Sequence, residues 1–354
     1  MSDLSRTGRS LMDRLSAGPV LCAEGYLFEL ERRGYLQAGA FVPEVVLAFP
    51  EVVIALHREF LRAGSDVMEA FTYYGHREKL RLIGKEDRLE PLQRNALALA
   101  REVAAEAPDE PPLIAGNICN TNVWNPQDGR TDAIVQAMFD EQVAWAADAG
   151  VDYIIAETFS YYGEARLALD AIKRAGLPAV VTLAMHQGEV LRDGVQFEDA
   201  AKRLEQTGAE VVGLNCARGP QTLLPYAARI RQAVSCHVAA LPVAYRTTDA
   251  QPTFQSLQDP LSRALPDDRP FPTALDPFTC TRYEMAAFAQ QAADLGIRYI
   301  GGCCGSGPHH IRAMAEALGR RPPASQYSPD MSKHYALGTH SSLRQADREF
   351  VEKL

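Results

Sequence analysis

Short apolar runs alternate along the chain with longer segments in which apolar residues recur every three or four positions. The short runs predict buried strands and the longer segments predict amphipathic helices. This pairing occurs eight times. The predicted strands are Val20–Ala23, Val67–Phe71, Leu113–Gly116, Tyr153–Ala156, Ala179–Leu183, Val211–Leu214, His237–Leu241 and Arg298–Ile300. The predicted helices are Glu44–Ala63, Leu92–Glu106, Thr131–Ala147, Glu164–Arg174, Phe197–Gln206, Pro220–Ala233, Arg282–Leu295 and Pro308–Leu318.

The regular alternation of strands and helices predicts an α/β fold with a parallel sheet. Eight strand–helix pairs over a chain of this length favour one closed (β/α)8 barrel, a TIM barrel, over an open sheet. No GxGxxG motif follows the first predicted strand, which argues against a dinucleotide-binding sheet. We therefore expect one barrel domain over residues 1–321.

Two segments depart from the regular plan. Pro242–Pro277, between the seventh strand and its helix, is rich in proline and polar residues. We expect it to form a long loop over the carboxyl end of the barrel, where barrel active sites are built. Residues 322–354 are mostly polar up to a predicted short helix, Leu343–Leu354. We expect this C-terminal extension to pack on the barrel or on a neighbouring subunit of a homo-oligomer.

Composition narrows the function classes. The net charge of −9 and the lack of a basic run argue against a nucleic-acid partner. The first fifteen residues contain no apolar core of a signal peptide. No apolar stretch approaches the roughly 20 residues that a membrane-spanning helix needs. These features predict a cytoplasmic protein that acts on small molecules and has no membrane partner.

Two adjacent cysteines occupy the glycine-rich turn Gly301–Gly307 between the last strand and its helix. Neighbouring cysteines rarely form a disulfide with each other, because the bond geometry strains the peptide. Two thiolates on one side of a loop, here Cys303 and Cys304, suit a soft metal ion. Seven cysteines without an export signal indicate reduced thiols. We expect four of them to be small buried side chains: Cys22, Cys119, Cys236 and Cys280.

Cys216 is the candidate for a third ligand. It follows the sixth strand, as Cys303 and Cys304 follow the eighth, and all strands of a closed barrel end at the same mouth. Three protein ligands and one open position are typical of a catalytic zinc site, so we predict Zn²⁺ as the cofactor. A zinc ion with three thiolates suits a substrate thiol, whose pKa is ordinarily about 8.5 and which coordination ionises. Attack of that sulfur on a methyl group is the expected reaction.

Several motifs around these cysteines are specific. They are Gly213-Leu214-Asn215-Cys216, Tyr299–Gly305, Phe28–Gly39 and His57–Ala70. Through them the sequence, from about Val20 to Pro323, resembles the zinc-dependent homocysteine S-methyltransferase family, and within it the betaine–homocysteine methyltransferases. The resemblance implies a (β/α)8 barrel, zinc on the three cysteines, and homocysteine as the methyl acceptor that becomes methionine.

The resemblance also implies roles for individual residues. Glu157, at the end of the fourth strand, would bind the amino group of homocysteine, and a carboxylate at a barrel mouth is a suitable partner for an ammonium group. Gly25 and Asn215 would line the same pocket. Tyr74 matches a family tyrosine that lies near the zinc and contacts the methyl donor.

A methylated cationic donor needs aromatic faces around it. Candidates at the mouth are Tyr73, Tyr74, Phe41 and Tyr245, with Phe159 as a further one, whereas Phe71 is expected in the core. Three positions depart from the betaine enzymes. Ala23-Glu24-Gly25 stands where they have Asp-Gly-Gly, so Glu24 is the candidate replacement for the aspartate. Phe41 stands where they have tryptophan, and Thr158 where they have tyrosine.

Four hypotheses follow. The first is zinc-dependent methyl transfer from glycine betaine or a related cation to homocysteine. The second keeps the acceptor but uses a sulfonium donor, S-methylmethionine or dimethylsulfoniopropionate. The third is a barrel that binds zinc or a thiol without catalysis. The fourth is a structural or redox role for the Cys303–Cys304 pair without metal.

Overall fold

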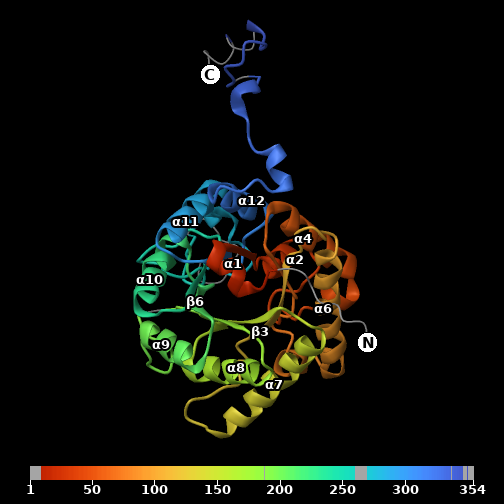
Figure 1. Cartoon of the computed structure of the whole chain (residues 1–354), viewed down its shortest axis with the longest axis vertical. Coiled ribbons are helices and arrows are strands. Elements are labelled where there is room, and N and C mark those ends of the chain that lie inside the picture. Colours follow the sequence, from red (N-terminus) through yellow and green to blue (C-terminus); the bar gives the residue numbers. More distant parts are fainter. Residues whose placement is uncertain (1–8, 187, 260–268, 336, 346–348, 350–354) are drawn as a thin grey trace.

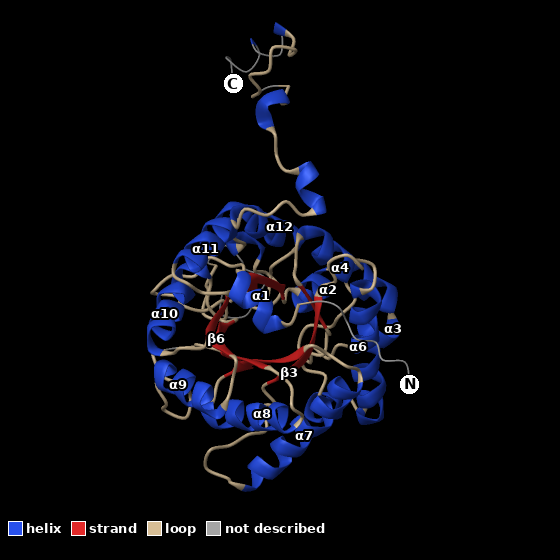
Figure 2. Ribbon diagram, viewed as in Figure 1, coloured by secondary structure: helices blue, strands red, loops and turns tan. Residues whose placement is uncertain are grey.

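Eight parallel strands follow one another in a single sheet that curves into a barrel (Figure 2). The computed structural model describes residues 9–186, 188–259, 269–335, 337–345 and 349. In the hydrogen-bonded order β1-β8-β7-β6-β5-β4-β3-β2, strands β1 and β2 stand at the two ends, and contacts between these two strands close the barrel. The predicted (β/α)8 barrel is confirmed. The strands are β1 (Val20–Ala23), β2 (Val67–Glu69), β3 (Leu113–Cys119), β4 (Tyr153–Phe159), β5 (Ala179–Leu183), β6 (Val211–Asn215), β7 (His237–Leu241) and β8 (Tyr299–Gly302).

One long helix follows each strand and packs on the outside of the barrel (Figure 1). These helices are α4 (Pro50–Ala63), α6 (Leu89–Ala104), α7 (Arg130–Asp148), α8 (Tyr162–Arg174), α9 (Phe197–Thr207), α10 (Pro220–Ala233), α11 (Arg282–Asp294) and α12 (Pro308–Ala317). Shorter helices are α1 (Leu11–Ala17), α2 (Tyr26–Arg32), α3 (Val45–Ala48) and α5 (Arg77–Leu82). Short 3-10 turns are η1 (Glu86–Arg88), η3 (Asp276–Phe278), η4 (Pro323–Tyr327) and η5 (Met331–Lys333).

The predicted single helix Glu44–Ala63 is wrong, because the structure divides it into α3 and α4. Phe49 between them has φ −142° and ψ 61°, outside the helical region. Pro50 is the cause, since proline disfavours a helical conformation in the residue before it and has no N–H for the preceding turn. The same proline suits the first position of a new helix, and α4 begins there.

The lower part of the barrel interior is apolar. Alternate strand residues point inward, and a buried cluster of such residues is joined by Leu11 and Leu15 of α1. Helix α1 therefore closes the amino-terminal end of the barrel, and it lies across the barrel centre in Figure 1. A capping box starts it, in which Ser10 Oγ accepts from the Asp13 amide at 3.2 Å.

The upper part of the interior is polar. Continuing the same alternation toward the carboxyl ends of the strands brings Glu69, Asn117, Glu157 and Asn215 inward from β2, β3, β4 and β6. All four are buried, and hydrogen bonds join them. The barrel thus changes from apolar to polar on approaching its mouth.

The long loop after β7 lies at this mouth, as predicted. The amide of Ala244 donates to the Cys304 carbonyl at 3.0 Å, and that of Phe254 to the Ala217 carbonyl at 2.8 Å. The loop is therefore tied to the turns after β8 and β6. Residues 260–268 of this loop lie outside the described residues.

The C-terminal extension leaves the barrel beside α12. Turn η4 contacts α4 and α12, and the Arg62 guanidinium lies 5.5 Å from the centre of the Tyr327 ring. Beyond it the chain runs away from the barrel (Figure 1). Most of the predicted helix Leu343–Leu354 lies outside the described residues. Within the described part of the chain, no helix combines the length and apolar character needed to cross a membrane.

Candidate metal centre

Three thiols meet at the mouth of the barrel. Cys216 directly follows β6, and Cys303 and Cys304 directly follow β8. The Cys304 sulfur lies 3.8 Å from that of Cys216 and 3.9 Å from that of Cys303. A tetrahedral metal with bonds of about 2.3 Å to sulfur places its ligands about 3.8 Å apart. The spacing and chemistry of these thiols therefore fit a thiophilic metal such as zinc.

The turn that carries Cys303 and Cys304 is fixed by its neighbours. The amide of Cys303 donates to the Pro242 carbonyl at 2.9 Å, and that of Ser306 to the Cys303 carbonyl at 3.0 Å. Gly305 has φ +81°, and a Cβ there would lie 2.5 Å from Cζ of the Tyr245 ring. Only glycine fits this position, so backbone hydrogen bonds and the Tyr245 ring together aim the two thiols.

Backbone strain gathers at the predicted site. In the described parts of the chain, six non-glycine residues have positive φ, and four of them are Phe41, Tyr74, Thr158 and Cys216, at 55°, 60°, 63° and 56°. The left-handed region disfavours residues with a side chain, and such residues cluster at functional sites. Tyr74, Thr158 and Cys216 lie at or shortly after the ends of β2, β4 and β6, and Phe41 lies between α2 and α3, so the strain marks this end of the barrel as the functional face.

The three thiols influence one another's pKa. Hydrogen bonds from Cys303 and Cys304 hold the pKa of the Cys216 thiol well below its usual range. The same hydrogen bonds raise the pKa of Cys303 and Cys304 well above theirs. A metal cation held by these sulfurs would favour the thiolate form of all three.

Glu157 lies beside the thiols and is buried. Its Oε1 accepts from Asn117 Nδ2 at 2.5 Å, and its Oε2 accepts from Asn215 Nδ2 at 2.7 Å and from Thr158 Oγ1 at 3.1 Å. Burial raises the pKa of Glu157 to about 7, although these hydrogen bonds act in the opposite direction and lower it. A carboxylate oxygen of Glu157, one of Glu24 and the Cys303 sulfur all lie within 4.8 Å of one another.

Glu24 is a second buried carboxyl group at the mouth of the barrel. It is 7% exposed, and neither of its oxygens has a partner within the described part of the chain. Burial and the nearby Glu157 raise its pKa well above the usual range. Buried polar groups are nearly always paired, so the position of Glu24 fits a cationic group bound between it and Glu157.

Aromatic side chains lie around the thiols. The rings of Tyr73 and Tyr74 are half-buried and 4.3 Å apart between centres. The Tyr74 amide donates to Cys119 Sγ at 3.2 Å, and the Lys79 ammonium lies 3.9 Å from the Tyr74 ring centre. Burial raises the pKa of Tyr74 to about 12, and the nearby Cys216 thiolate adds to the shift. Phe41 is half-buried, with its ring 6.0 Å from that of Phe28.

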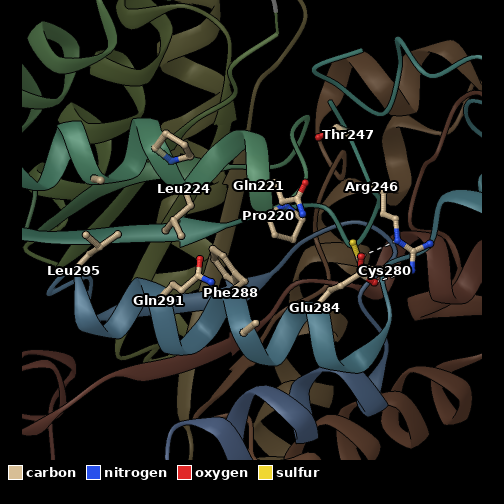
Figure 3. A pocket seen from close by; sticks show the side chains of 13 residues that line it. Pro220, Gln221, Leu224, Arg246, Thr247, Cys280, Glu284, Phe288, Gln291 and Leu295 are labelled. Atoms are coloured by element: carbon tan, nitrogen blue, oxygen red, sulfur yellow. Dashed lines mark hydrogen bonds and ion pairs between the residues drawn. The ribbon is translucent and has the colours of Figure 1, made fainter. Parts of the chain in front are cut away.

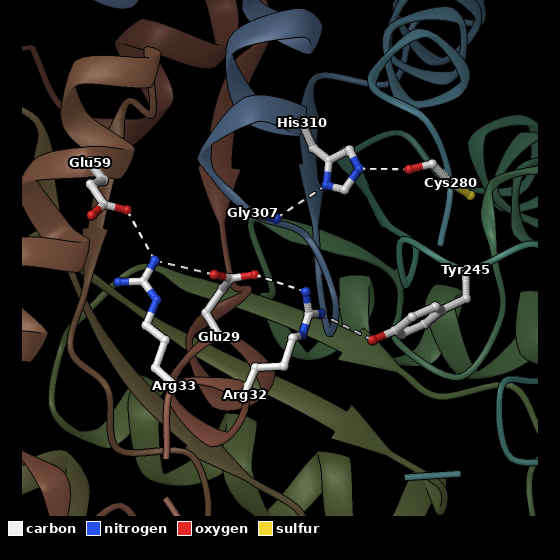
Figure 4. Close-up of polar contacts among 8 residues, drawn as sticks. All are labelled: Glu29, Arg32, Arg33, Glu59, Tyr245, Cys280, Gly307 and His310. Carbon is white, nitrogen blue, oxygen red and sulfur yellow. Dashed lines mark hydrogen bonds and ion pairs between the residues drawn. The ribbon is translucent and has the colours of Figure 1, made fainter. Parts of the chain in front are cut away.

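The other predicted residues differ in exposure. Tyr245 is 2% exposed, its hydroxyl accepts from Arg32 at 3.4 Å (Figure 4), and it backs the cysteine turn. Gly25 begins α2, where a Cβ would lie 1.8 Å from the Ser306 carbonyl oxygen. Phe71 is buried, as predicted. Phe159 as a mouth residue is wrong, because it is fully buried and packs edge to face on Phe139 of α7.

Helix α12 begins close to the thiols, and His310 stabilises its start. Nδ1 of His310 accepts from the Gly307 amide at 3.1 Å, which leaves Nε2 to donate to the Cys280 carbonyl at 2.8 Å (Figure 4). Both ring nitrogens are thereby used. The residue fixes the turn after Cys304 and is not placed as a metal ligand.

Sequence reasoning missed three polar residues of the site. Two of them are Asn117 and Glu69: Asn117 donates hydrogen bonds to Glu157 and to Glu69. The third is His186, which lies near Cys216 and has one ring nitrogen 2.9 Å from the Ser160 hydroxyl. The inward alternation along β2 and β3 carries a signal for Glu69 and Asn117. His186 follows a strand end, a signal shared with many residues that have no role.

A separate groove of about 460 Å³ lies on the outside of the barrel between α10 and α11 (Figure 3). Its floor is apolar, with Leu224 and Phe288, and an ion pair between Arg246 and Glu284 lies at one end. The three thiols are not among the residues that line it.

The comparison with protein families is decisive for the class of enzyme. The family model described as homocysteine S-methyltransferase matches residues 25–318, which include all three cysteines. The chain belongs to the homocysteine S-methyltransferase family. The family resemblance noted in the sequence, and the assignment to this class of enzyme, are therefore confirmed.

Members of this family are similar to the chain over nearly its whole length. Betaine–homocysteine S-methyltransferase 1 from Xenopus tropicalis is 36% identical over 362 residues, covering 98% of this chain and 86% of that protein. S-methylmethionine–homocysteine S-methyltransferase BHMT2 from Pongo abelii is 33% identical over 358 residues, covering 98% and 93%. The metallated form of the homocysteine methyltransferase MmuM from Escherichia coli shares the fold, with a TM-score of 0.67 and 19% identity over 85% of this chain and 97% of that one.

Proposed function

We propose that this protein transfers a methyl group from a methylated cationic donor to the thiol of homocysteine, giving methionine, at a zinc ion held by Cys216, Cys303 and Cys304. One observation carries the proposal: three thiols with the spacing of metal ligands lie within reach of two buried carboxyl groups, Glu24 and Glu157. Thiols suit a metal that binds a substrate sulfur, and the carboxyl groups suit the ammonium group of an amino acid. Bound zinc would supply Lewis acidity that keeps the acceptor sulfur ionised at neutral pH.

The acceptor pocket is built from four residues. Glu157, held by Asn215 on one oxygen, and the unpaired Glu24 would bind the ammonium group. The Gly25 backbone and the Asn215 amide would line the pocket beside them. On this proposal Glu24 takes the place of the aspartate that the betaine enzymes carry one position earlier.

The donor would bind above the thiols, among Phe41, Tyr73, Tyr74, Thr158 and Tyr245. Aromatic faces favour a methylated nitrogen or sulfur cation. The acceptor sulfur attacks the donor methyl carbon, and the bond from that carbon to the onium atom breaks and leaves its electron pair on the donor. The donor thereby loses its positive charge, and the thiol proton goes to solvent. Holding the two reacting atoms in line lowers the barrier.

Glycine betaine is the first donor we propose, and S-methylmethionine or dimethylsulfoniopropionate is the alternative. Relatives named for betaine and for S-methylmethionine are both similar to this chain. Phe41 and Thr158 are smaller than the residues that the betaine enzymes carry at these two positions. This difference supports the alternative, a donor whose shape differs from that of betaine.

The test is methionine formation by zinc-loaded protein with homocysteine and each of the three donors supplied separately. Methionine made from one donor supports the reaction and identifies that donor. A well-folded, zinc-loaded protein that makes no methionine from any of them refutes the proposal.

The metal ligands have their own test. Replacing Cys304 with alanine removes one of three ligands, so we expect bound zinc and methionine formation to fall together to background. Cys236→Ala is the matched control, since this cysteine is half-buried at the start of β7 and away from the mouth. Zinc content by mass spectrometry and methionine formation are measured on both variants. Activity in a zinc-free Cys304→Ala protein would contradict the mechanism.

We also propose that the chain divides into a barrel, residues 1–321, and a C-terminal extension, residues 322–354. The extension would pack on the barrel or on a neighbouring subunit of a homo-oligomer. The family match at residues 25–318 lies within the barrel. The composition supports a cytoplasmic location.

A further inference from the structure

The geometry points to Asn117, anchored by Glu69, as the positioning residue that fixes the Glu157 carboxylate for the ammonium group of the acceptor. This inference rests on the proposed function, because it assumes that Glu157 binds that ammonium group. It assigns a role to two residues that the family resemblance does not.

Asn117 stands between two carboxyl groups. Its Nδ2 lies 2.5 Å from Glu69 Oε1 and 2.5 Å from Glu157 Oε1. A side-chain amide has two N–H groups, so one hydrogen is donated to each carboxyl group. The three side chains are 3–4% exposed. The amide therefore has its orientation set by Glu69 and delivers its second hydrogen to Glu157.

Glu157 is thereby held from two sides. Asn117 of β3 donates to Oε1, and Asn215 of β6 donates to Oε2 at 2.7 Å. The two amides come from strands on either side of β4, and they fix the carboxylate plane against rotation. Asn215 is fixed in turn, because its Oδ1 accepts the Thr158 amide at 2.9 Å. Asn117 has no such backbone bond to its Oδ1, which has no partner within the described residues. Glu69 is therefore its anchor.

Glu69 lies one step further from the mouth. The Cys22 thiol donates to its Oε2 at 3.9 Å, and Asn117 donates to its Oε1. A glutamine at position 69 keeps a side-chain oxygen that can accept from Asn117, whereas an alanine does not. The pair Glu69→Gln and Glu69→Ala therefore tests whether a neutral side chain that can accept from Asn117 is enough to anchor it.

This arrangement predicts a selective effect on acceptors. A fixed carboxylate matters for a thiol that carries an ammonium group and not for one that lacks it. The matched pair is homocysteine and 4-mercaptobutanoate, which has the same thiol, chain and carboxylate but no amino group. A variant that loosens Glu157 should weaken homocysteine binding and leave 4-mercaptobutanoate binding unchanged.

The experiment measures the Kd of both thiols by calorimetry on zinc-loaded wild type, Asn117→Ala, Glu69→Ala and Glu69→Gln. We expect Asn117→Ala to raise the Kd of homocysteine about tenfold or more, the usual effect of losing a hydrogen bond to a charged group. Glu69→Ala should shift it in the same direction, and Glu69→Gln should recover most of that loss. The Kd of 4-mercaptobutanoate should stay within about twofold of wild type in all of them.

Two results would overturn the inference. One is an equal loss of affinity for both thiols in Asn117→Ala, with zinc content and melting temperature retained, since that is a structural effect. The other is a wild type that binds homocysteine no tighter than 4-mercaptobutanoate. Failure of the proposed function looks different: homocysteine binds selectively, yet no donor yields methionine.

Discussion

Cys216 combines a proposed ligand role with a strained backbone. Its φ of 56° lies in the left-handed region, which costs a residue with a Cβ about 1–2 kcal/mol. Glycine would remove that cost, yet it carries no thiol. A cysteine at this position therefore lowers the stability of the fold, which is consistent with a residue kept for its thiol.

This conflict gives a stability prediction. Cys216→Ala and Cys216→Gly both remove the thiol, but only glycine adopts the left-handed conformation without strain. We expect metal-free Cys216→Gly to be more stable to unfolding than metal-free Cys216→Ala by about 1 kcal/mol. Urea denaturation in a chelator measures the difference. Equal stability would mean that the backbone at position 216 relaxes once the thiol is gone.

His57 gives a prediction about acid stability. It is fully buried, one ring nitrogen lies 2.9 Å from the Tyr26 hydroxyl, and burial lowers its pKa to about 3. The unfolded chain binds a proton at His57 below its ordinary pKa of about 6.5, whereas the folded chain does not. Its contribution to stability is thus complete above about pH 6.5 and is lost as pH falls toward 3, by about 1.4 kcal/mol per pH unit.

The measurement compares the unfolding free energy of wild type and His57→Gln from pH 7.5 to pH 5. We expect the wild type to lose stability more steeply than the variant below about pH 6.5. Other buried groups titrate in both proteins, so the difference between the two slopes isolates His57. Parallel curves would contradict the prediction.

At the scale of elements, much of the fold was predictable because each strand and its long helix carry a clear local pattern. The cysteine site was predictable for the same reason, since Cys216 and Cys303 mark strand ends directly. Glu69 and Asn117 were missed because the alternation along β2 and β3 indicates only that they point inward, whereas their role depends on which side chains meet across the barrel. Helix α1 was not predicted, because its buried residues are Leu11 and Leu15, and two residues one turn apart are too few to show a helical repeat.

Helix α1 nevertheless contributes to stability. Leu15 is 1% exposed and packs with the apolar barrel interior. We expect Leu15→Ala to lower the free energy of unfolding by about 2–4 kcal/mol, through lost burial and the cavity left behind. Met12→Ala is the control, since Met12 is only partly buried on the same helix. Denaturant unfolding of both variants measures the effect, and equal small losses would show that α1 does not close the barrel.

At the scale of the whole molecule, the C-terminal extension carries apolar side chains that the barrel does not cover. Tyr327, Met331, Tyr335 and Leu337 are 51–68% exposed. Such side chains along an extended strip are suited to a surface of another subunit. They are the physical support for the proposed homo-oligomer.

We predict that replacing these four residues together with serine lowers the oligomeric state and leaves the barrel folded. Light scattering after size exclusion gives the mass, and circular dichroism reports the fold. Exchange of four exposed barrel residues, Ile134, Leu82, Tyr283 and Leu295, for serine is the control. An unchanged mass in the first variant would remove the extension from the interface.

The packed apolar layer of the lower barrel interior, with helix α1 beneath it, also closes that end of the barrel to small molecules. Whatever reaches the polar upper layer must enter through the mouth and return by the same way. On the proposed function, homocysteine would bind against that layer, and the donor would bind nearer the entrance. On that proposal homocysteine would bind before the donor, its product would leave after the spent donor, and a donor that binds first would block access to the acceptor pocket. A high donor concentration should then slow turnover, and raising the homocysteine concentration should relieve that inhibition.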